Sequence, residues 1–490
     1  MRSVRHWLRP LVFLSNNVLS LAGVVIVTTA TLLWLYFLQI TLRGGVPHPY
    51  LGIVIYMLIP ALFLLGLILI PIGIWWNRRG KIRKGEMPAE FPPLDPSNPD
   101  LRRLAGFVTV TTVLNIIITM QFTYSAVNYM DSVSFCGQTC HTVMRPEFTA
   151  HQQSPHSKVE CVNCHIGPGA SWFVKSKLSG AGQLVAVALN NYPRPIPVPV
   201  RNLRPARETC ETCHWPQKFD EDRLRDIVTY GSDEQNTQTH TVLMLHLGGG
   251  HSRIGIHGRH VGEGITVRYY ASDDKRENIP WVEYTAGGQT TVFAASGASK
   301  PDESKLRTMD CIDCHNRPTH IYLLPERAID QAIAAGDISP TLPFVKKTAV
   351  SILKQQYASS QDADATIPAA FENFYKDKYA QIYADRRGDI SRAAQAVKAA
   401  FDHNVFPEMK VGWGTYANNL GHTDFTGCFR CHDESHTSTN GKAITQDCSA
   451  CHNLLASDEK NPKILVDLGL EKASPEPAKQ GGEKKAGGSK

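Results

Sequence analysis

Twelve cysteines carry the plainest chemistry in this 490-residue chain, because all of them fall in six motifs in which two cysteines precede a histidine. The motifs are Cys136, Cys140 and His141; Cys161, Cys164 and His165; Cys210, Cys213 and His214; Cys311, Cys314 and His315; Cys428, Cys431 and His432; and Cys448, Cys451 and His452. Five have the spacing Cys-x-x-Cys-His, and the first has one extra residue between its cysteines. At the regular spacing, two thiols add to the vinyl groups of a haem and the histidine ligates its iron. We therefore expect six attached haems c.

Because the motif is repeated, neither chance nor a zinc site explains it. One copy alone could be accidental, or half of a zinc site. For the irregular first motif, the alternative is an unmodified pair of thiols. No cysteine remains for a disulfide. The net charge of +6 is modest and is concentrated near the membrane segments and the C-terminal tail, so nucleic acid is not an implied partner.

Three apolar stretches precede the first motif, at about residues 11–40, 51–76 and 104–127. Each reaches the roughly 20 residues that a membrane-spanning helix needs. A buried core helix or a signal peptide is the alternative for any one of them. The first stretch is too long for a signal peptide and lacks a small-residue cleavage site. We expect three N-terminal transmembrane helices, with the first haem close to the membrane surface.

Basic residues set the orientation of these helices. Arginines precede the first stretch, and seven lysines and arginines lie between the second and third, whereas Arg43 stands alone between the first and second. Cytoplasmic loops carry the excess of lysine and arginine. The N-terminus is therefore expected in the cytoplasm of a bacterium, with the haem domain on the periplasmic side of the inner membrane, where haem c is attached.

The rest of the chain divides by pattern into a mostly α-helical or irregular multihaem domain with a small β insertion. We predict a transmembrane region at 1–128, a domain with four motifs at 129–324, a helical segment with the last two motifs at 325–457 and a disordered tail at 458–490. Alternating apolar residues and turn signals at about 240–299 indicate the β insertion.

Histidine is abundant enough to supply a second axial ligand to every iron. The chain has 19 histidines, of which six are in the motifs. Eleven more are candidates for the opposite face: His151, His156, His240, His246, His251, His257, His260, His320, His403, His422 and His436. Iron with two histidines has no open position and favours electron transfer, whereas an open position would favour catalysis on a small molecule. No Cys-x-x-Cys-Lys motif is present.

The segment 167–192 is apolar, begins with glycines and contains Lys175 and Lys177. It is either a packed amphipathic helix with exposed lysines or a helix lying in the membrane interface. In the second case the lysines could hydrogen-bond a quinol oxygen beside the first haem. Glu147 and Asp131 are candidate acceptors for the quinol protons, and ordinary surface carboxylates are the alternative.

Residues 108–320 resemble the NapC/NirT (NrfH-like) family of membrane-anchored quinol dehydrogenases. The matching parts are the span leading into FCGQTCH, the Ser-Pro-His that ends at His156, and the motifs CVNCH, CETCH and CIDCHNRPTH. The resemblance implies that His156 and His320 are distal ligands, joined by His257 or His260. In family members a methionine two residues after the motif histidine can ligate the first haem. The nearest methionine here is Met144, three residues after His141, and the first motif is itself one residue longer than in the family.

Residues 405–436 resemble the longer inner-membrane multihaem cytochromes of metal-reducing bacteria, in which the histidines matching His422 and His436 would be distal ligands. These resemblances imply a protein that oxidises quinol, such as menaquinol, from the membrane quinone pool and passes electrons to a periplasmic redox protein or complex. Two alternatives stay open. One is a haem-wire subunit of a larger respiratory or photosynthetic complex, without its own quinol site. The other is a terminal reductase with one open haem.

Overall fold

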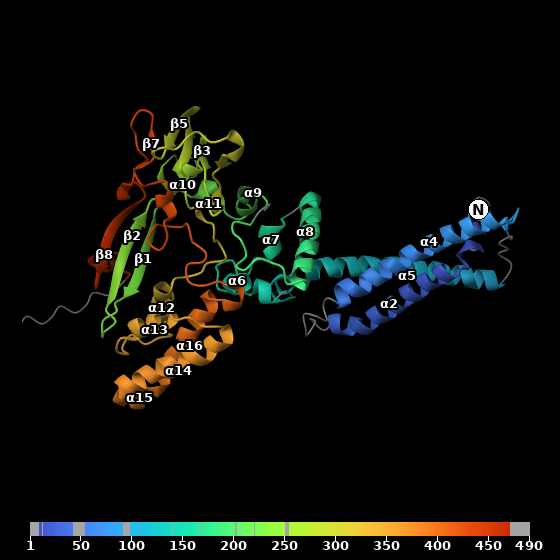
Figure 1. Ribbon diagram of the computed structural model, residues 1–490, viewed down its shortest axis with the longest axis horizontal. Helices are drawn as coiled ribbons and strands as arrows, with labels where there is room; N and C mark the ends of the chain where they lie inside the picture. Colours follow the sequence, from blue (N-terminus) through green and yellow to red (C-terminus); the bar gives the residue numbers. More distant parts are fainter. Residues whose placement is uncertain are drawn as a thin grey trace, which may run out of the picture. The chain divides into compact units, whose positions relative to one another are not determined.

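The computed structural model describes residues 9–11, 13–42, 54–91, 99–139, 141–167, 169–200, 203–219, 221–249 and 254–470. The chain divides into two units (Figure 1). The first comprises 1–148 and 158–176, and the second comprises 149–157 and 177–490. His251 lies outside the described residues, as does Cys140 of the first motif.

Long apolar helices make up the first part of unit 1. They are α2 (Val18–Leu42), α4 (Ile59–Lys84), which follows the π-helical turn η1 (Val54–Leu58), and α5 (Pro99–Asp131). Among the described residues, two segments are long and apolar enough to cross a membrane, Val18–Phe37 and Ile59–Lys84. They correspond to the first two predicted spans. The third predicted span falls within α5, several of whose side chains lie outside the described residues, and its membrane crossing stays a prediction.

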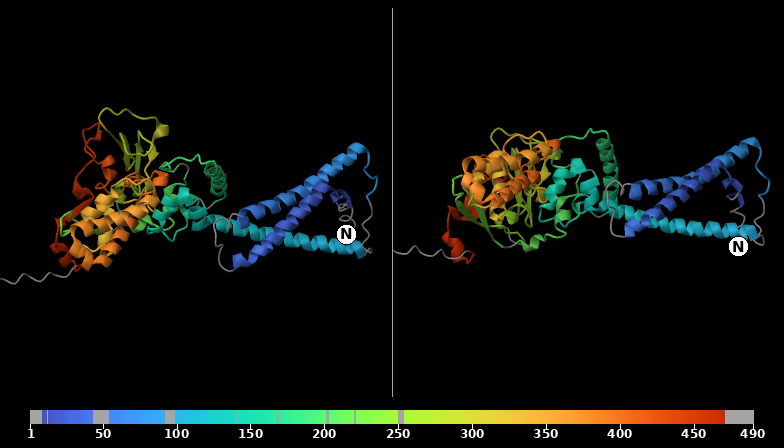
Figure 2. Two further views of the ribbon diagram at one scale, coloured as in Figure 1. Left: turned by 60° about the horizontal axis from the view of Figure 1, so that its bottom comes forward. Right: turned by 90° about the horizontal axis from the view of Figure 1, so that it is seen from below.

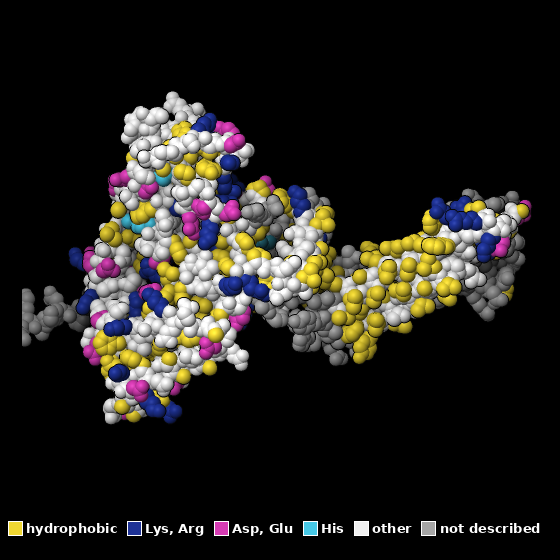
Figure 3. All heavy atoms as spheres, in the orientation of Figure 1, with side chains coloured by type: hydrophobic (Ala, Val, Ile, Leu, Met, Phe, Trp, Pro, Cys, Tyr) yellow, Lys and Arg dark blue, Asp and Glu magenta, His cyan; other side chains and the backbone are white. Residues whose placement is uncertain are grey.

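Helices α2 and α4 cross at a pair of glycines. A Cβ atom on Gly23 would lie 2.7 Å from the carbonyl oxygen of Gly66, and one on Gly66 would lie 2.8 Å from that of Gly23. Small residues let helix backbones approach this closely. Phe122 of α5 packs on Trp34 and Phe63, with ring centroids 4.9 and 6.2 Å away. Hydrophobic side chains cover the outside of these helices (Figure 3), as expected of a surface facing lipid.

Short helices follow α5 and carry the first two motifs. They are η2 (Phe135–Thr139), α6 (His141–Gln152), α7 (Cys161–His165) and α8 (Ala170–Ala188). The last covers most of the predicted amphipathic segment. Val174, Leu178 and Val185 of α8 are exposed, so the helix keeps an uncovered apolar face.

Two antiparallel sheets form much of unit 2. A three-stranded sheet has the order β1-β2-β8, and a five-stranded sheet has the order β6-β3-β4-β5-β7. The strands are β1 (Arg223–Tyr230), β2 (Gln238–Leu245), β3 (Ile265–Tyr270), β4 (Trp281–Ala286), β5 (Gln289–Ala294), β6 (Arg307–Thr308), β7 (Thr437–Ser438) and β8 (His452–Glu459). Gly287 and Gly288, at φ +58° and +79°, make the tight turn between β4 and β5, which needs positive φ at both central positions.

The β region is larger than the predicted insertion at 240–299. It begins at Arg223, and each sheet takes an edge strand from the C-terminal region, β7 or β8. The start of the predicted disordered tail is also folded, because β8 runs to Glu459 and α17 (Lys463–Asp467) follows it. Residues 471–490 lie outside the described residues.

Helices α12 to α16 gather into one bundle, which both views of Figure 2 show in orange. Their bounds are α12 (Pro325–Ala334), α13 (Val345–Leu353), α14 (Ser360–Lys378), α15 (Ala380–Asp385) and α16 (Arg387–Asn404). The predicted helical segment is thus present. Ile329, Phe371 and Val397 are fully buried in a core built almost entirely from the bundle itself, so these helices form a haem-free subdomain.

Short helical turns lie between the larger elements of unit 2. They are α9 (Ala206–Cys210), η3 (Pro216–Lys218), α10 (Gly255–His260), η4 (Glu303–Lys305), α11 (Cys311–Cys314), η5 (Pro407–Met409), η6 (Gly427–Arg430) and η7 (Cys448–Ala450). Four of them contain cysteines of the attachment motifs.

Candidate functional site

The attachment motifs in unit 2 fold as short helical turns. His214 N donates to Cys210 O and His315 N to Cys311 O, both at 2.8 Å. His432 N donates to the carbonyl oxygen of its first motif cysteine, 3.1 Å away. Residues three and four apart lie on one face of such a turn, so the two cysteines and the histidine point to the same side. None of the eleven cysteines that the structure describes is in a disulfide, so disulfide bonding does not compete with attachment.

Four motif histidines face a second histidine from a distant part of the sequence. The pairs, with their ring-centroid separations, are His156 with His214 (6.0 Å), His257 with His315 (6.3 Å), His260 with His432 (5.8 Å) and His422 with His452 (6.2 Å). By contrast, His422 stacks directly on Phe429 at 4.2 Å. The paired rings are therefore too far apart to touch by stacking.

This separation fits one iron atom between each pair of rings. Haem iron takes its axial ligands on opposite faces of the porphyrin. Two metal–imidazole bonds of about 2 Å each, added to the distances from each nitrogen to its ring centre, give a centroid separation of about 6 Å. In the part of the chain that the structure describes, each ring contact joins two histidines, which matches haem, since the porphyrin supplies the other four nitrogens.

Hydrogen bonds hold several of these rings in the form that binds iron. Nδ1 of His432 lies 2.7 Å from Thr445 O, Nδ1 of His260 lies 2.7 Å from Ile256 O, and Nδ1 of His156 lies 3.1 Å from Pro318 O. A carbonyl oxygen only accepts, so in each ring Nδ1 donates its proton and Nε2 keeps a free lone pair for a metal.

Burial adds to this preference for the neutral ring. It lowers the pKa of His257, His260, His315 and His452 below the usual value for histidine. A neutral imidazole is the form that ligates a metal. Nδ1 of His257 and Nδ1 of His452 are buried without a hydrogen-bond partner among the described residues.

His436 does not fit the ligand role predicted for it. Its Nδ1 lies 2.7 Å from Asp433 Oδ1 and its Nε2 lies 2.6 Å from Ile279 O, so neither nitrogen is left for iron. His240 is engaged in the same way, by Asp226 and Gln238. Both rings have structural roles, and the geometry argues against His436 as a distal ligand.

Comparison with known proteins agrees with the site. Residues 99–195 match the model of the NapC/NirT cytochrome c family, N-terminal region. The chain is 40% identical over 454 residues to the cytochrome c-type protein ImcH of Geobacter sulfurreducens, and the match covers 91% of this chain and 89% of that protein. The chain belongs to the NapC/NirT family of c-type cytochromes.

The NapC/NirT cytochrome is also 25% identical over 113 residues to the cytochrome c-type protein NrfH of Wolinella succinogenes, over 22% of this chain and 63% of that protein. No solved structure matches it. Membership of the family implies haem c, and the paired histidines and the motif cysteines are the residues that would hold it.

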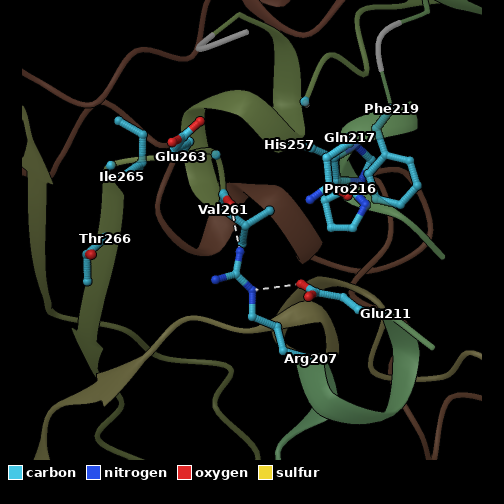
Figure 4. Close-up of a pocket in the computed structure, with 13 residues that line it drawn as sticks. Arg207, Glu211, Pro216, Gln217, Phe219, His257, Val261, Glu263, Ile265 and Thr266 are labelled. Atoms are coloured by element: carbon cyan, nitrogen blue, oxygen red, sulfur yellow. Dashed lines mark hydrogen bonds and ion pairs between the residues drawn. The ribbon is translucent and has the colours of Figure 1, made fainter. Parts of the chain in front are cut away.

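A cavity of about 350 Å³ lies beside His257 and the third motif (Figure 4). His257 and Phe219 line it, together with Arg207 and Glu211. The Arg207 guanidinium lies between Glu211, 3.1 Å away, and Val261 O, 2.7 Å away. The NapC/NirT cytochrome thus has a half-open cavity beside the candidate ligand His257.

The four motifs of unit 2 are neighbours in series. Cys210 and Cys311 share a side-chain hydrogen bond, which lowers the pKa of Cys210 and raises that of Cys311. Burial, and then the nearby Cys428, raise the pKa of Cys314 to about 11. Burial and Cys428 likewise raise the pKa of Cys451. Attached sulfurs are thioethers and do not titrate, so these shifts report only which sulfurs are close: the third motif meets the fourth, the fourth the fifth, and the fifth the sixth.

The remaining predicted site residues fall on the helices around the first two motifs. Asp131 ends α5, while Met144 and Glu147 lie on α6. Lys175 is exposed on α8, with Nζ 4.7 Å from the ring centroid of Trp172. Lys177 follows on the same helix. The side chains of Cys140 and His141 lie outside the described residues, so the ligands of the first motif stay a prediction.

Sequence reasoning left open which distal histidine serves which motif. It proposed His257 or His260, and the structure pairs both with motif histidines, of the fourth and fifth motifs. The partners in these pairs are far apart in the chain and no spacing rule relates them. Sequence reasoning also missed Asp313 and Arg430, charged residues inside the fourth and fifth motifs, because the two middle positions of Cys-x-x-Cys-His accept many residue types.

Proposed function

We propose that this cytochrome is a membrane-anchored quinol dehydrogenase that carries six haems c and passes electrons from membrane quinol to a periplasmic acceptor. The N-terminal helices anchor it in the bacterial inner membrane, with the haem domain on the periplasmic side. Haem iron supplies one-electron oxidation and reduction, and the chain's own residues bind, order and insulate the sites.

The facing histidine pairs are the observation that carries the proposal. If haems are attached at the third to sixth motifs, each pair would supply two ligands to one iron and leave it no open position, which suits electron transfer. The same four motifs adjoin one another in order. We assign His156, His257, His260 and His422 as the distal ligands of the third, fourth, fifth and sixth motifs, respectively.

At the membrane end, the residues predicted from the sequence would handle the quinol. Oxidation of quinol to quinone releases two electrons and two protons. Lys175 Nζ or Lys177 Nζ would donate a hydrogen bond to a quinol oxygen, and a carboxylate oxygen of Glu147 or Asp131 would accept a proton. The family resemblance and the exposed apolar face of α8 support this placement, since quinol reaches the protein from the lipid phase.

The two alternatives make different demands on the same sites. A terminal reductase needs an open iron, which the pairs disfavour for the third to sixth motifs. A haem-wire subunit would have the same pairs but no quinol site of its own, and it would act only with a partner that oxidises quinol.

The test is anaerobic reduction of the purified protein in liposomes that contain menaquinol. The expected result is reduction of the haem absorption bands without any other protein. Dithionite serves as the control that every haem can be reduced. Reduction by dithionite alone would contradict a quinol dehydrogenase, and recovery of menaquinol reduction on adding a co-purifying partner would identify a wire subunit.

A further inference from the structure

Asp313, between the two cysteines of the fourth motif, is the centre of a buried polar cluster. Its side chain is 2% exposed. It accepts hydrogen bonds from Tyr269 Oη at 2.7 Å, Arg276 Nη1 at 3.0 Å and Arg307 Nε at 2.9 Å. It also accepts from Asp310 N at 2.7 Å, within a capping box at the start of α11. Two guanidinium groups therefore neutralise one buried carboxylate.

Arg430 joins this cluster from the fifth motif. Its Nη2 donates to Asp313 O at 2.7 Å, its Nη1 donates to Arg276 O at 2.8 Å, and its Nε donates to Gly427 O at 2.8 Å. All three acceptors are backbone carbonyls, so Arg430 pairs with no carboxylate through these bonds. One fixed cation thus lies inside the fifth motif and against the backbone of the fourth.

Guanidinium groups outnumber carboxylates among these residues. Arg276 and Arg307 meet the carboxylate of Asp313, whereas Arg430 reaches only backbone carbonyls. The nearby carboxylate of Asp310 accepts instead from backbone amides, Ala206 N at 3.0 Å and Cys311 N at 2.7 Å. Arginine stays charged at any ordinary pH, and charges act more strongly in a partly buried site than in water.

We propose that Arg430 sets the reduction potentials of the fourth and fifth haems and holds their two attachment motifs together, with Asp313 as the opposing charge. Reduction adds one negative charge to a haem. A fixed cation stabilises the reduced form and raises the potential, whereas a fixed anion lowers it. Arg430 thus raises the reduction potentials of these two haems, and Asp313 lowers them. The proposal rests on the proposed haem attachment at these motifs and not on quinol oxidation.

Redox titration of the purified holoprotein with chemical mediators, followed by electron paramagnetic resonance, tests this. The ring planes of His257 and His315, at the fourth motif, are 9° apart, and those of His260 and His432, at the fifth motif, are 58° apart. Nearly parallel planes give a rhombic low-spin signal and strongly crossed planes a highly anisotropic one. The fourth haem is therefore followed among the rhombic signals, which the sixth haem shares, and the fifth among the anisotropic signals, which the third haem shares.

Arg430→Gln is expected to lower the midpoint of the fifth haem, with a smaller decrease for the fourth. A tenfold change in the equilibrium constant corresponds to about 59 mV for one electron. Arg430→Lys keeps the charge and should stay close to the wild-type value. Asp313→Asn should raise the midpoint of the fourth haem. Arg386→Gln, in the haem-free bundle, is the control that should leave all midpoints unchanged.

Equal shifts in Arg430→Gln and Arg430→Lys would overturn the proposal, because they would show a role in packing alone. A decrease in Asp313→Asn would also overturn it, and this variant keeps the test decisive if Arg430→Gln loses a haem. The titration uses no quinol, so its result can be interpreted even if menaquinol fails to reduce the wild-type protein.

Discussion

His422 and His452 face one another with ring planes 18° apart and centroids 6.2 Å apart, a separation that one iron between them would produce. His452 belongs to the last attachment motif, and His422 precedes the motif before it. The third to sixth motifs share this arrangement: the motif supplies one histidine of the pair, and a segment outside the motif supplies the other. The predictions below test that arrangement one residue at a time.

Replacing His422 with alanine should open the sixth haem. The iron loses its distal ligand, so one haem per chain is expected to become high-spin in the oxidised protein and to bind carbon monoxide when reduced. Optical and resonance spectra of the purified variant measure both changes. The matched control is His436→Ala, which removes a histidine whose two ring nitrogens are already hydrogen bonded. If His436→Ala gave the high-spin haem and His422→Ala did not, the assignment would be reversed.

Replacing His156 with alanine should affect the third haem. The planes of His156 and His214 are 75° apart, so the wild-type third haem is expected to contribute a highly anisotropic low-spin signal. That signal should decrease in His156→Ala, while the rhombic signals of the fourth and sixth haems persist. Loss of a rhombic signal, with the anisotropic signals intact, would place His156 at another haem.

Replacing Lys175 with methionine should impair the reaction with quinol. If Lys175 donates a hydrogen bond to the quinol oxygen, its loss removes about 1.5–3 kcal/mol of binding, which is about tenfold or more in kcat/KM for menaquinol. Reduction by dithionite should be unaffected. Lys347→Met is a matched control, because Lys347 also lies over an aromatic ring, Phe344, but in the haem-free bundle. Equal kinetics in the two variants would remove Lys175 from the quinol site.

Truncating Phe371 should destabilise the haem-free bundle. Its side chain is fully buried in the core of helices α12 to α16. Phe371→Ala is expected to cost about 3–5 kcal/mol of unfolding free energy, measured by denaturant titration of helical circular dichroism. The neighbouring exposed Asn373→Ala should change it by less than about 0.5 kcal/mol. If both variants unfolded like the wild type, the bundle would not contain the core described here.

Local signals in the sequence predicted the local structure. Apolar spacing placed the bundle helices, and the cysteine spacing placed the attachment motifs, because both depend on residues a few positions apart. Pairings across the chain were harder to predict. Nothing in the sequence indicates that His260 meets His432, or that β8 adds to the β1–β2 sheet, because tertiary packing decides these contacts. The prediction for His436 failed for the same reason: the resemblance to longer multihaem cytochromes favoured a ligand role, but Asp433 and Ile279 engage its ring.

One measurement tests the facing pairs most directly: the number of low-spin haems per chain in the oxidised, fully loaded protein, from quantitative electron paramagnetic resonance. If each of the four pairs shares one iron, at least four haems per chain are low-spin, with both rhombic and highly anisotropic signals present. Fewer than four low-spin haems per chain would contradict the assignment, and with it a relay of closed sites from the third motif to the sixth.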